Sequence, residues 1–219
     1  MNRVHPLSCG LGYAFLIETP EGLFLVDSGS PGQHEKVLAK MKELRRSDLK
    51  FIWITHAHYD HYGSAAALGR LTGAKIAVHR ADADCMINGQ SPLGVPHNYG
   101  FIYYPGQQVV DWIRPLPKTP PDFALEDGDS LERFGLKAIL LHTPGHTPGH
   151  SCLLLEGGIA FAGDLVTNSP RPGLQALLAA DWSRIPGSLA ELQAAKPDWV
   201  YTGHSGKAMS GEELQRIKL

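Results

Sequence analysis

Side chains that could bind a metal ion are concentrated in the stretch from Thr55 to Gly63. Three histidines and an aspartate lie within six positions there, at His56, His58, Asp60 and His61. Neutral imidazole and carboxylate groups suit zinc and other divalent transition metals, whereas a structural zinc finger would need cysteine thiolates. A polar loop that happens to be rich in histidine is the simpler explanation, since the chain has 11 histidines. The density of ligand-type residues in so short a stretch favours a metal site.

The elements that would position these residues are β-strands. Phe51 to Ile54 is apolar and rich in β-branched and aromatic residues, which predicts a buried strand that ends at the histidine cluster. Three further predicted strands lead into ligand-type residues, namely His146, Asp164 and His204. Strand ends that gather at one edge of stacked sheets would bring all of these side chains to a common cleft. A single metal site is the economical interpretation.

Turn and periodicity signals elsewhere predict alternating strands and helices. Apolar runs at 13–17 and 23–26, separated by a turn containing Pro20 and Gly22, indicate a hairpin. The turn that follows carries Asp27, which would either cap a backbone amide or point toward the site. Helices are expected at 34–46, at 63–71, at 174–196 with a break near Pro186–Gly187, and at 211–217. Further strands are expected at 76–79, 123–125, 136–141, 151–155, 158–162 and 199–201. This order is typical of an α/β fold in which helices cover sheets.

The segment from Ser91 to Pro121 interrupts this rhythm and holds seven of the 16 prolines. A long irregular segment inside a compact domain is more often a binding loop or lid than a plain connector. Its aromatic side chains, among them Tyr99, Tyr103 and Tyr104, would line an apolar substrate pocket, or else anchor the loop to the core or form a contact in a homo-oligomer. His97 is expected to be a surface or hydrogen-bonded residue.

Composition restricts the class of protein. With 219 residues, 43% of them hydrophobic and 19% charged, the chain is expected to form a single globular domain over 1–219, with 91–121 as a loop insertion. A formal charge of -2 without a block of lysine or arginine disfavours nucleic acid as a partner. The three cysteines, at 9, 85 and 152, indicate neither a disulfide framework nor a zinc knuckle. No signal peptide or run of 18 apolar residues is found, so we expect no membrane partner and a cytoplasmic location.

Over nearly its whole length, the chain resembles the metallo-β-lactamase-fold hydrolases. The motifs that carry the resemblance are, in family order, Val26-Asp27-Ser28-Gly29, His56-x-His58-x-Asp60-His61, Thr-Pro-Gly-His146-Thr-x-Gly-His150, Gly163-Asp164 and Thr202-Gly203-His204. The resemblance implies an αββα four-layer sandwich with a two-metal site at one edge. It implies that the first metal is held by His56, His58 and His146, the second by Asp60, His61 and His204, and that Asp164 bridges both. His142 and His150 match no ligand position, and we interpret His150 as structural.

The implied site suits hydrolysis of a small-molecule substrate. Two metals about 3.5–4 Å apart can share a hydroxide because each lowers the pKa of bound water, while Asp60 orients the water and passes a proton. We expect two zinc ions per chain, with iron or manganese as alternatives.

Differences from individual members of the family that the chain resembles narrow the set of possible substrates. Asp164 argues against a dedicated β-lactamase, which commonly has cysteine or serine near that point, so β-lactam hydrolysis is a secondary alternative. Homoserine-lactone lactonases place a tyrosine where this chain has Thr167, and hydroxyacylglutathione hydrolases add a helical C-terminal domain. The expectation that remains is cleavage of an ester, thioester, lactone or phosphoester. A mononuclear iron persulfide dioxygenase is the main alternative, because two histidines and a carboxylate also form an iron site. A metal-binding protein without catalysis is a further alternative.

Overall fold

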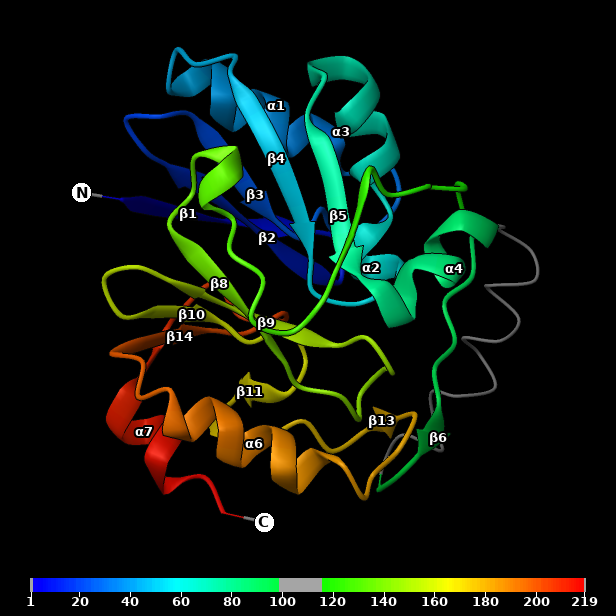
Figure 1. The fold of residues 1–219 in the computed structure, drawn as a ribbon, viewed down its shortest axis with the longest axis vertical. Helices are drawn as coiled ribbons and strands as arrows, with labels where there is room; N and C mark the ends of the chain where they lie inside the picture. Colours follow the sequence, from blue (N-terminus) through cyan, green and yellow to red (C-terminus); the bar gives the residue numbers. More distant parts are fainter. Residues whose placement is uncertain (1, 99–115, 219) are drawn as a thin grey trace.

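Two β-sheets stacked face to face form the centre of the molecule (Figure 1). The computed structural model describes residues 2–98 and 116–218. The first sheet has the strand order β1-β2-β3-β4-β5-β7 and consists of β1 (Arg3–Cys9), β2 (Gly12–Glu18), β3 (Leu23–Val26), β4 (Leu49–Ile54), β5 (Lys75–His79) and β7 (Phe123–Leu125). The second has the order β15-β14-β10-β9-β8 and consists of β8 (Ala138–His142), β9 (Ser151–Leu155), β10 (Ile159–Phe161), β14 (Trp199–Tyr201) and β15 (Met209–Ser210).

Two short strand pairs lie outside the main sheets. β11 (Val166–Asn168) pairs with β12 (Pro172–Leu174) as a hairpin, and β6 (Val95–Pro96) pairs with β13 (Leu178–Ala179). Both pairs follow or adjoin the strand ends of the second sheet, so they border the cleft at which the ligand-type residues were predicted to meet.

Helices cover the outer faces of both sheets (Figure 1). The first sheet is covered by α1 (His34–Glu43), α3 (Ala65–Thr72) and α4 (Arg80–Asn88), with the short α2 (Tyr59–Tyr62) at the end of β4. The second sheet is covered by α6 (Ile185–Ala194) and α7 (Gly211–Arg216), while a 3-10 turn, η1 (Glu132–Phe134), precedes β8. The layers therefore run helix, sheet, sheet, helix, which confirms the predicted αββα arrangement.

Strand periodicity explains how the layers are held together. Successive side chains of a strand point to opposite faces, and in β4 Phe51 and Trp53 pack between the two sheets, while Ile52 and Ile54 pack against the helices. The strand is buried on both faces, which is why it is continuously apolar. A third apolar cluster joins the second sheet to α6 and α7. The apolar layers together form the rigid base from which the polar strand ends project.

Most predicted elements are present, and the sequence missed some. The hairpin at 13–17 and 23–26 is confirmed as β2 and β3, and the helix predicted at 63–71 is present as α3, which ends at Gly73 in a left-handed conformation. β1 and α4 were not predicted. β1 carries Pro6 and mixed polar residues with partial burial, so it lacks a clear alternating pattern. β15, which follows β14, was not predicted either.

The helix predicted at 174–196 is wrong over its first part. Only Ile185–Ala194 is helical, and Leu178–Ala179 forms a strand with Val95–Pro96 instead. Pro186 lies in the first turn of α6, where a missing N–H costs nothing, so it begins the helix and does not break it. Before it, the Asp181 carboxylate accepts hydrogen bonds from the backbone and hydroxyl of Ser183, which favours a turn.

None of the helices in the described ranges, 2–98 and 116–218, is long and apolar enough to cross a membrane.

Candidate metal centre

The ends of parallel strands bring the predicted ligands to one edge of the sandwich. β3, β4, β5 and β7 run parallel, as do β10 and β14 in the second sheet. Their carboxyl ends lead into the segments that carry the cluster: 56–61 after β4, Asp164 after β10 and His204 after β14, while His146 lies between β8 and β9. The approach is close enough to require a glycine, because a β-carbon at Gly203 would overlap the Asp164 carboxylate and the His61 ring. All seven predicted side chains meet in this cluster.

Three imidazole nitrogens form the first group. His58 Nδ1 lies 3.1 Å from His56 Nε2 and 3.0 Å from His146 Nε2. Two imidazoles on one tetrahedral zinc, with Zn–N of about 2.0–2.1 Å, would place their nitrogens about 3.3 Å apart. All three rings are almost fully buried. The spacing is therefore close to that of three nitrogens that share one metal ion.

The carboxylates of Asp60 and Asp164 complete a second group with His61 and His204. Asp164 Oδ2 lies 2.9 Å from His204 Nε2 and 3.6 Å from His146 Nε2, and its Oδ1 lies 3.5 Å from His61 Nε2. Asp60 Oδ2 lies 3.7 Å from His204 Nε2 and 3.9 Å from His61 Nε2. Asp164 thus reaches histidines of both groups, which is the position expected of a bridging ligand.

Oxygen acceptors fix the tautomer of the rings. His58 Nε2 lies 2.9 Å from the carbonyl of Pro92, and His146 Nδ1 lies 2.9 Å from the carbonyl of Leu178. A carbonyl can only accept, so each of these nitrogens carries the hydrogen and donates it. The nitrogens that remain, His58 Nδ1 and His146 Nε2, are lone-pair acceptors that face each other at 3.0 Å. Two facing acceptors repel unless a cation lies between them.

The other rings are held in the same way. His204 Nδ1 donates to the carbonyl of Leu11 at 3.1 Å, and His61 Nδ1 donates to the Asp27 carboxylate at 2.9 Å. His56 Nδ1 lies 3.0 Å from the Thr55 hydroxyl, which donates its own hydrogen to Asp27. Metal-binding histidines in proteins usually donate their second nitrogen to an oxygen in this manner.

Buried atoms without hydrogen-bond partners mark the same place. Five buried side-chain atoms of the described residues have no hydrogen-bond partner, and two of them, His61 Nε2 and Asp164 Oδ1, belong to the cluster. Such atoms are rare in folded proteins and require an explanation, for which an ion is a common one. The residues present therefore fit a metal centre.

Electrostatics differ between the two groups. Burial, with a contribution from neighbouring imidazoles, lowers the pKa of His56 and His146 well below the ordinary value. In the second group, burial works against a charge on His61, but the carboxylates of Asp164, Asp60 and Asp27 outweigh it and raise its pKa well above the ordinary value. The Asp164 carboxylate likewise raises the pKa of His204 to about 9. The first group is thus neutral, while the second is strongly attractive to positive charge.

Asp27 performs both roles that the sequence left open. Its Oδ1 accepts from the backbone N–H of Thr55 at 2.8 Å, and its Oδ2 accepts from the ring of His61. It lies in the left-handed region at φ 57, which is strained for a residue other than glycine. Asp27 therefore ties the end of β3 to the end of β4 and orients a ring of the cluster.

Asp82 is a buried carboxylate that the sequence did not single out. One oxygen accepts from the backbone N–H of Ala57 at 2.8 Å and from the Thr147 hydroxyl at 2.7 Å, and the other accepts from the backbone N–H of Gly149 at 2.7 Å. Ala57 separates His56 from His58, and Thr147 follows His146. Asp82 therefore connects the two loops that carry the three-imidazole group. In sequence it resembles an ordinary acidic residue in the first turn of a helix, and no local motif distinguishes it.

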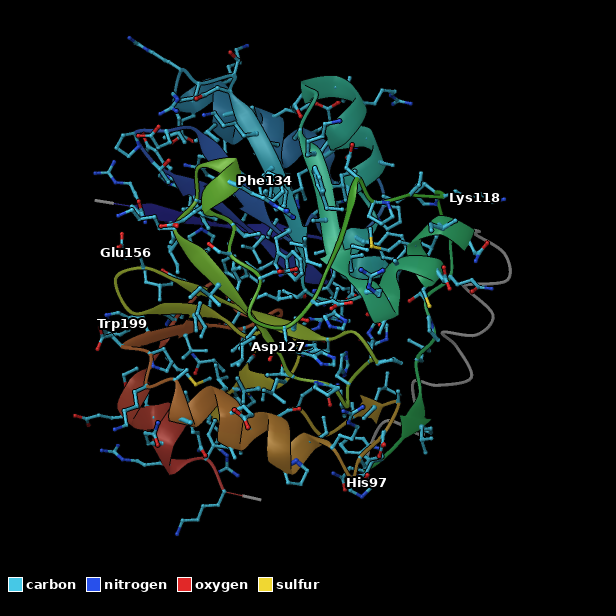
Figure 2. All side chains as sticks on the ribbon, viewed as in Figure 1. His97, Lys118, Asp127, Phe134, Glu156 and Trp199 are labelled. Atoms are coloured by element: carbon cyan, nitrogen blue, oxygen red, sulfur yellow. The ribbon has the colours of Figure 1, made fainter. Side chains whose placement is uncertain are left out.

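The remaining histidines lie outside the cluster of ligand atoms. His150 is buried and accepts from the backbone N–H of Asp164 at 3.1 Å, in agreement with a structural role. His142 stacks on His79 with ring centroids 3.9 Å apart. His97 is exposed, lies beside β6 and packs against Trp182 (Figure 2). The predicted substrate-contacting residues Tyr99, Tyr103 and Tyr104 lie outside the described residues.

Comparison with known proteins identifies a matching family and named enzymes among the relatives. Residues 7–204 match the metallo-beta-lactamase superfamily. Hydroxyacylglutathione hydrolase from Pseudomonas aeruginosa is 31% identical over 198 residues, which cover 88% of this chain and 61% of the relative. An N-acyl homoserine lactonase from Bacillus sp is 29% identical over 169 residues, covering 66% of this chain and 58% of the relative. The chain thus spans less than two thirds of the length of these two relatives.

Solved structures share the whole fold. A protein crystallised in a di-iron-bound form superimposes with a TM-score of 0.72 at 29% identity and covers 97% of this chain and 98% of its own. A B3 metallo-beta-lactamase superimposes with a TM-score of 0.74 at 22% identity, covering 97% of this chain and 95% of its own, and that likeness concerns the fold alone. Because the family match runs from residue 7 to residue 204 and the sandwich is shared from end to end, the chain belongs to the metallo-beta-lactamase superfamily.

Proposed function

We propose that the chain is a hydrolase that uses two divalent metal ions held in the histidine and aspartate cluster. The observation that carries the proposal is the orientation of the rings. In each of His58 and His146, the hydrogen of the ring is donated to a backbone carbonyl. The other nitrogen of each ring therefore carries a lone pair, and these two nitrogens face each other at 3.0 Å. A cation between them resolves the repulsion. Membership in the superfamily, and the hydrolases named among the relatives, support a hydrolytic reaction.

The ligand assignment follows from which atoms lie together. His56, His58 and His146 would hold one ion, because their nitrogens form the compact first group. Asp60, His61 and His204 would hold the other. Asp164 would bridge the two, since its carboxylate oxygens lie near histidines of both groups.

The chemistry would be divided between the ions and the side chains around them. When bound, two such ions supply a hydroxide near neutral pH and polarise the oxygen of the scissile bond. Asp60 lies at the rim of the second group, where one carboxylate oxygen can orient the attacking water and accept its proton. Asp27, Asp82 and the carbonyls behind the rings keep the ligands in place, so little reorganisation is needed as charge develops. The substrates that such a centre can cleave are esters, thioesters, lactones and phosphoesters.

The second candidate function is that of an iron-dependent persulfide dioxygenase, and one observation supports iron as the metal. A structural relative with 29% identity binds two irons, so zinc is not implied by the fold. A single iron held by two histidines and Asp164 would suit oxygen activation on a persulfide. Metal analysis of the purified protein, together with a measurement of oxygen consumption, distinguishes the hydrolase from the dioxygenase. Two metal ions per chain with no oxygen consumption support hydrolysis, whereas one iron with persulfide-dependent oxygen consumption supports the alternative.

Removal of single ligands tests the hydrolase proposal. His58→Ala should bind one ion fewer per chain than the wild type, and Asp164→Ala should weaken both sites because the bridge is lost. Each should reduce metal-dependent hydrolysis of model esters, lactones and phosphodiesters at least about 100-fold, the order expected when a group needed in the transition state is removed.

His5→Ala is the matched control. His5 lies on β1 and pairs with Glu18, away from the cluster, so its removal should change neither metal content nor rate. The measurements are metal content by elemental analysis, rates with added zinc, manganese or iron, and circular dichroism for folding. Wild-type rates in a folded His58→Ala or Asp164→Ala variant would refute the proposal.

A further inference from the structure

A cavity of about 430 Å³ lies against the candidate metal centre, on the side of the β11–β12 hairpin. Asp164 and His204 form its inner wall. The hairpin and the segment that follows it form the rest, and this segment returns to the first histidine group because Gln175 Nε2 lies 3.4 Å from His146 Nδ1. The cavity thus borders the second group and the Asp164 carboxylate that is proposed to bridge the two metals. Its volume is in the range of small-molecule sites.

The outer wall of the cavity is apolar. Val166, Leu174 and Leu177 contribute to it, and Leu177 is 41% exposed even though it is a large hydrophobic residue. The main polar hydroxyl nearby is already used, because Thr167 donates to the carbonyl of Ser169 and accepts from the backbone N–H of the same residue. Apolar surface next to a charged centre suits a substrate with an apolar group close to its reacting bond.

Gln175 is an uncharged side chain in this wall that has a hydrogen-bonding group left over. Its Oε1 accepts from the backbone N–H of Leu177 at 2.9 Å, which fixes the orientation of the amide. The ring nitrogen nearest its Nε2 belongs to His146 and already donates to the carbonyl of Leu178, so it cannot accept from Gln175. The NH₂ group is therefore available to donate to an oxygen of a bound molecule.

The charges of the side chains that line the cavity restrict the class of substrate further. Among the described residues that line the cavity, none is a lysine or an arginine. Phosphate and carboxylate groups distant from the metals would find no counter-ion there, and recognition of phosphate in proteins commonly uses such cations. A neutral acyl group fits the cavity better than a phosphoryl or polyanionic one.

We propose that this cavity is an acyl-binding site for a neutral ester, thioester or lactone with a short apolar chain, and that Gln175 donates a hydrogen bond to an oxygen of the acyl group. The inference rests on the proposed function, since the acyl carbon must lie at the metal centre. It selects acyl substrates from the wider set of bonds that the centre could cleave.

Simple carboxylates test the site without any reaction. Acetate, butyrate and hexanoate represent acyl products of increasing length, and their dissociation constants on the metal-loaded protein can be measured by calorimetry. Affinity should rise about twofold to fourfold for each added methylene, because each buried methylene contributes about 0.8 kcal/mol at most. Inorganic phosphate serves as a competitor that binds the metals without an apolar chain.

Two variants separate the roles of the wall and the amide. Leu177→Asp should abolish the increase with chain length, while the matched control Leu71→Asp, a 54% exposed leucine on α3, should leave it unchanged. Gln175→Glu keeps an oxygen that accepts from the backbone N–H of Leu177 but replaces the NH₂ donor with a second oxygen. The affinity for all three carboxylates should therefore fall at least tenfold, while the chain-length dependence of affinity stays intact. Circular dichroism establishes that each variant is folded.

The outcomes distinguish this inference from the proposed function. Equal affinity for acetate and hexanoate, no binding of hexanoate, or a chain-length dependence that survives Leu177→Asp overturns the acyl site. A chain-length dependence without metal-dependent ester or thioester hydrolysis would leave the binding site standing and overturn the hydrolase proposal. Metal-dependent hydrolysis without any chain-length dependence, in rate or in binding, would leave the hydrolase proposal standing and overturn the acyl site.

Discussion

Replacement of Asp82 tests whether the three-imidazole group is positioned by a buried carboxylate. In Asp82→Asn, the side-chain amide must face at least one of the three donors that the carboxylate now accepts, and the best orientation sacrifices only the bond to Gly149. A buried donor left without a partner costs about 1–3 kcal/mol. We therefore expect the free energy of unfolding of the metal-free protein to fall by about 2 kcal/mol. Asp82→Ala removes both acceptor oxygens and with them all three hydrogen bonds. Because the Thr147 hydroxyl can rotate to another partner, the two backbone donors set the expected loss at about 2–6 kcal/mol.

The metal affinity should change along with stability. Ala57 and Thr147 adjoin the three histidines of the first group, so loosening their loops should weaken the first metal by about 10–100-fold, as loss of outer hydrogen bonds does at other metal sites. Urea unfolding with and without chelator gives the stability, and chelator competition gives the affinity. Asp84→Asn is the matched control, because Asp84 is exposed on the same helix. Lower stability with unchanged metal affinity would refute a positioning role.

Three further predictions concern proton equilibria and thiols. The Asp164 carboxylate raises the pKa of His204 to about 9, so a proton competes with the second metal below that pH; affinity should rise from pH 7 to 9, and calorimetry in two buffers should detect proton release. Burial lowers the pKa of His150 to about 4, so between pH 6.5 and 4 only the unfolded chain binds this proton. Stability should therefore fall as the pH falls, by up to about 3 kcal/mol, and His150→Gln should reduce that slope in urea unfolding. Burial raises the pKa of Cys152 to about 12, so native protein should react with a thiol reagent at Cys85 before Cys9 or Cys152, as mass spectrometry would detect.

The strands that end at the cluster could be predicted because a local sequence pattern marks each of them. The continuous apolar run of β4 followed at once by His56 and His58 identifies both the strand and its polar end. Gly163 and Gly203 mark similar ends in the second sheet. That all four ends meet at one edge follows from a general property of sheets, and the structure brings together all seven predicted side chains.

Contacts between distant parts of the chain could not be predicted in this way. Asp82 accepts from Ala57, which is 25 residues away, and from Thr147 and Gly149, which are 65 and 67 residues away. Nothing in the local sequence of α4 specifies these partners. The erroneous helix at 174–184 has a similar cause. Its leucines and alanines favour a helix intrinsically, but the pairing of β13 with the distant β6 outweighs that preference.

Hydrogen bonds that join the two sheets make the ligand geometry a property of the folded chain itself. The backbone N–H of Ser151 donates to the carbonyl of Thr55, and that of Tyr13 donates to the carbonyl of Gly203, so each sheet holds a loop of the other. None of these bonds involves a metal ion. Because each ring is already turned by an oxygen acceptor, metal binding has little side-chain entropy left to remove, and more of the interaction energy appears as affinity. Metal ions in this fold would therefore bind to rings that the protein's own hydrogen bonds already orient, in contrast to a zinc finger, where the metal is needed for folding.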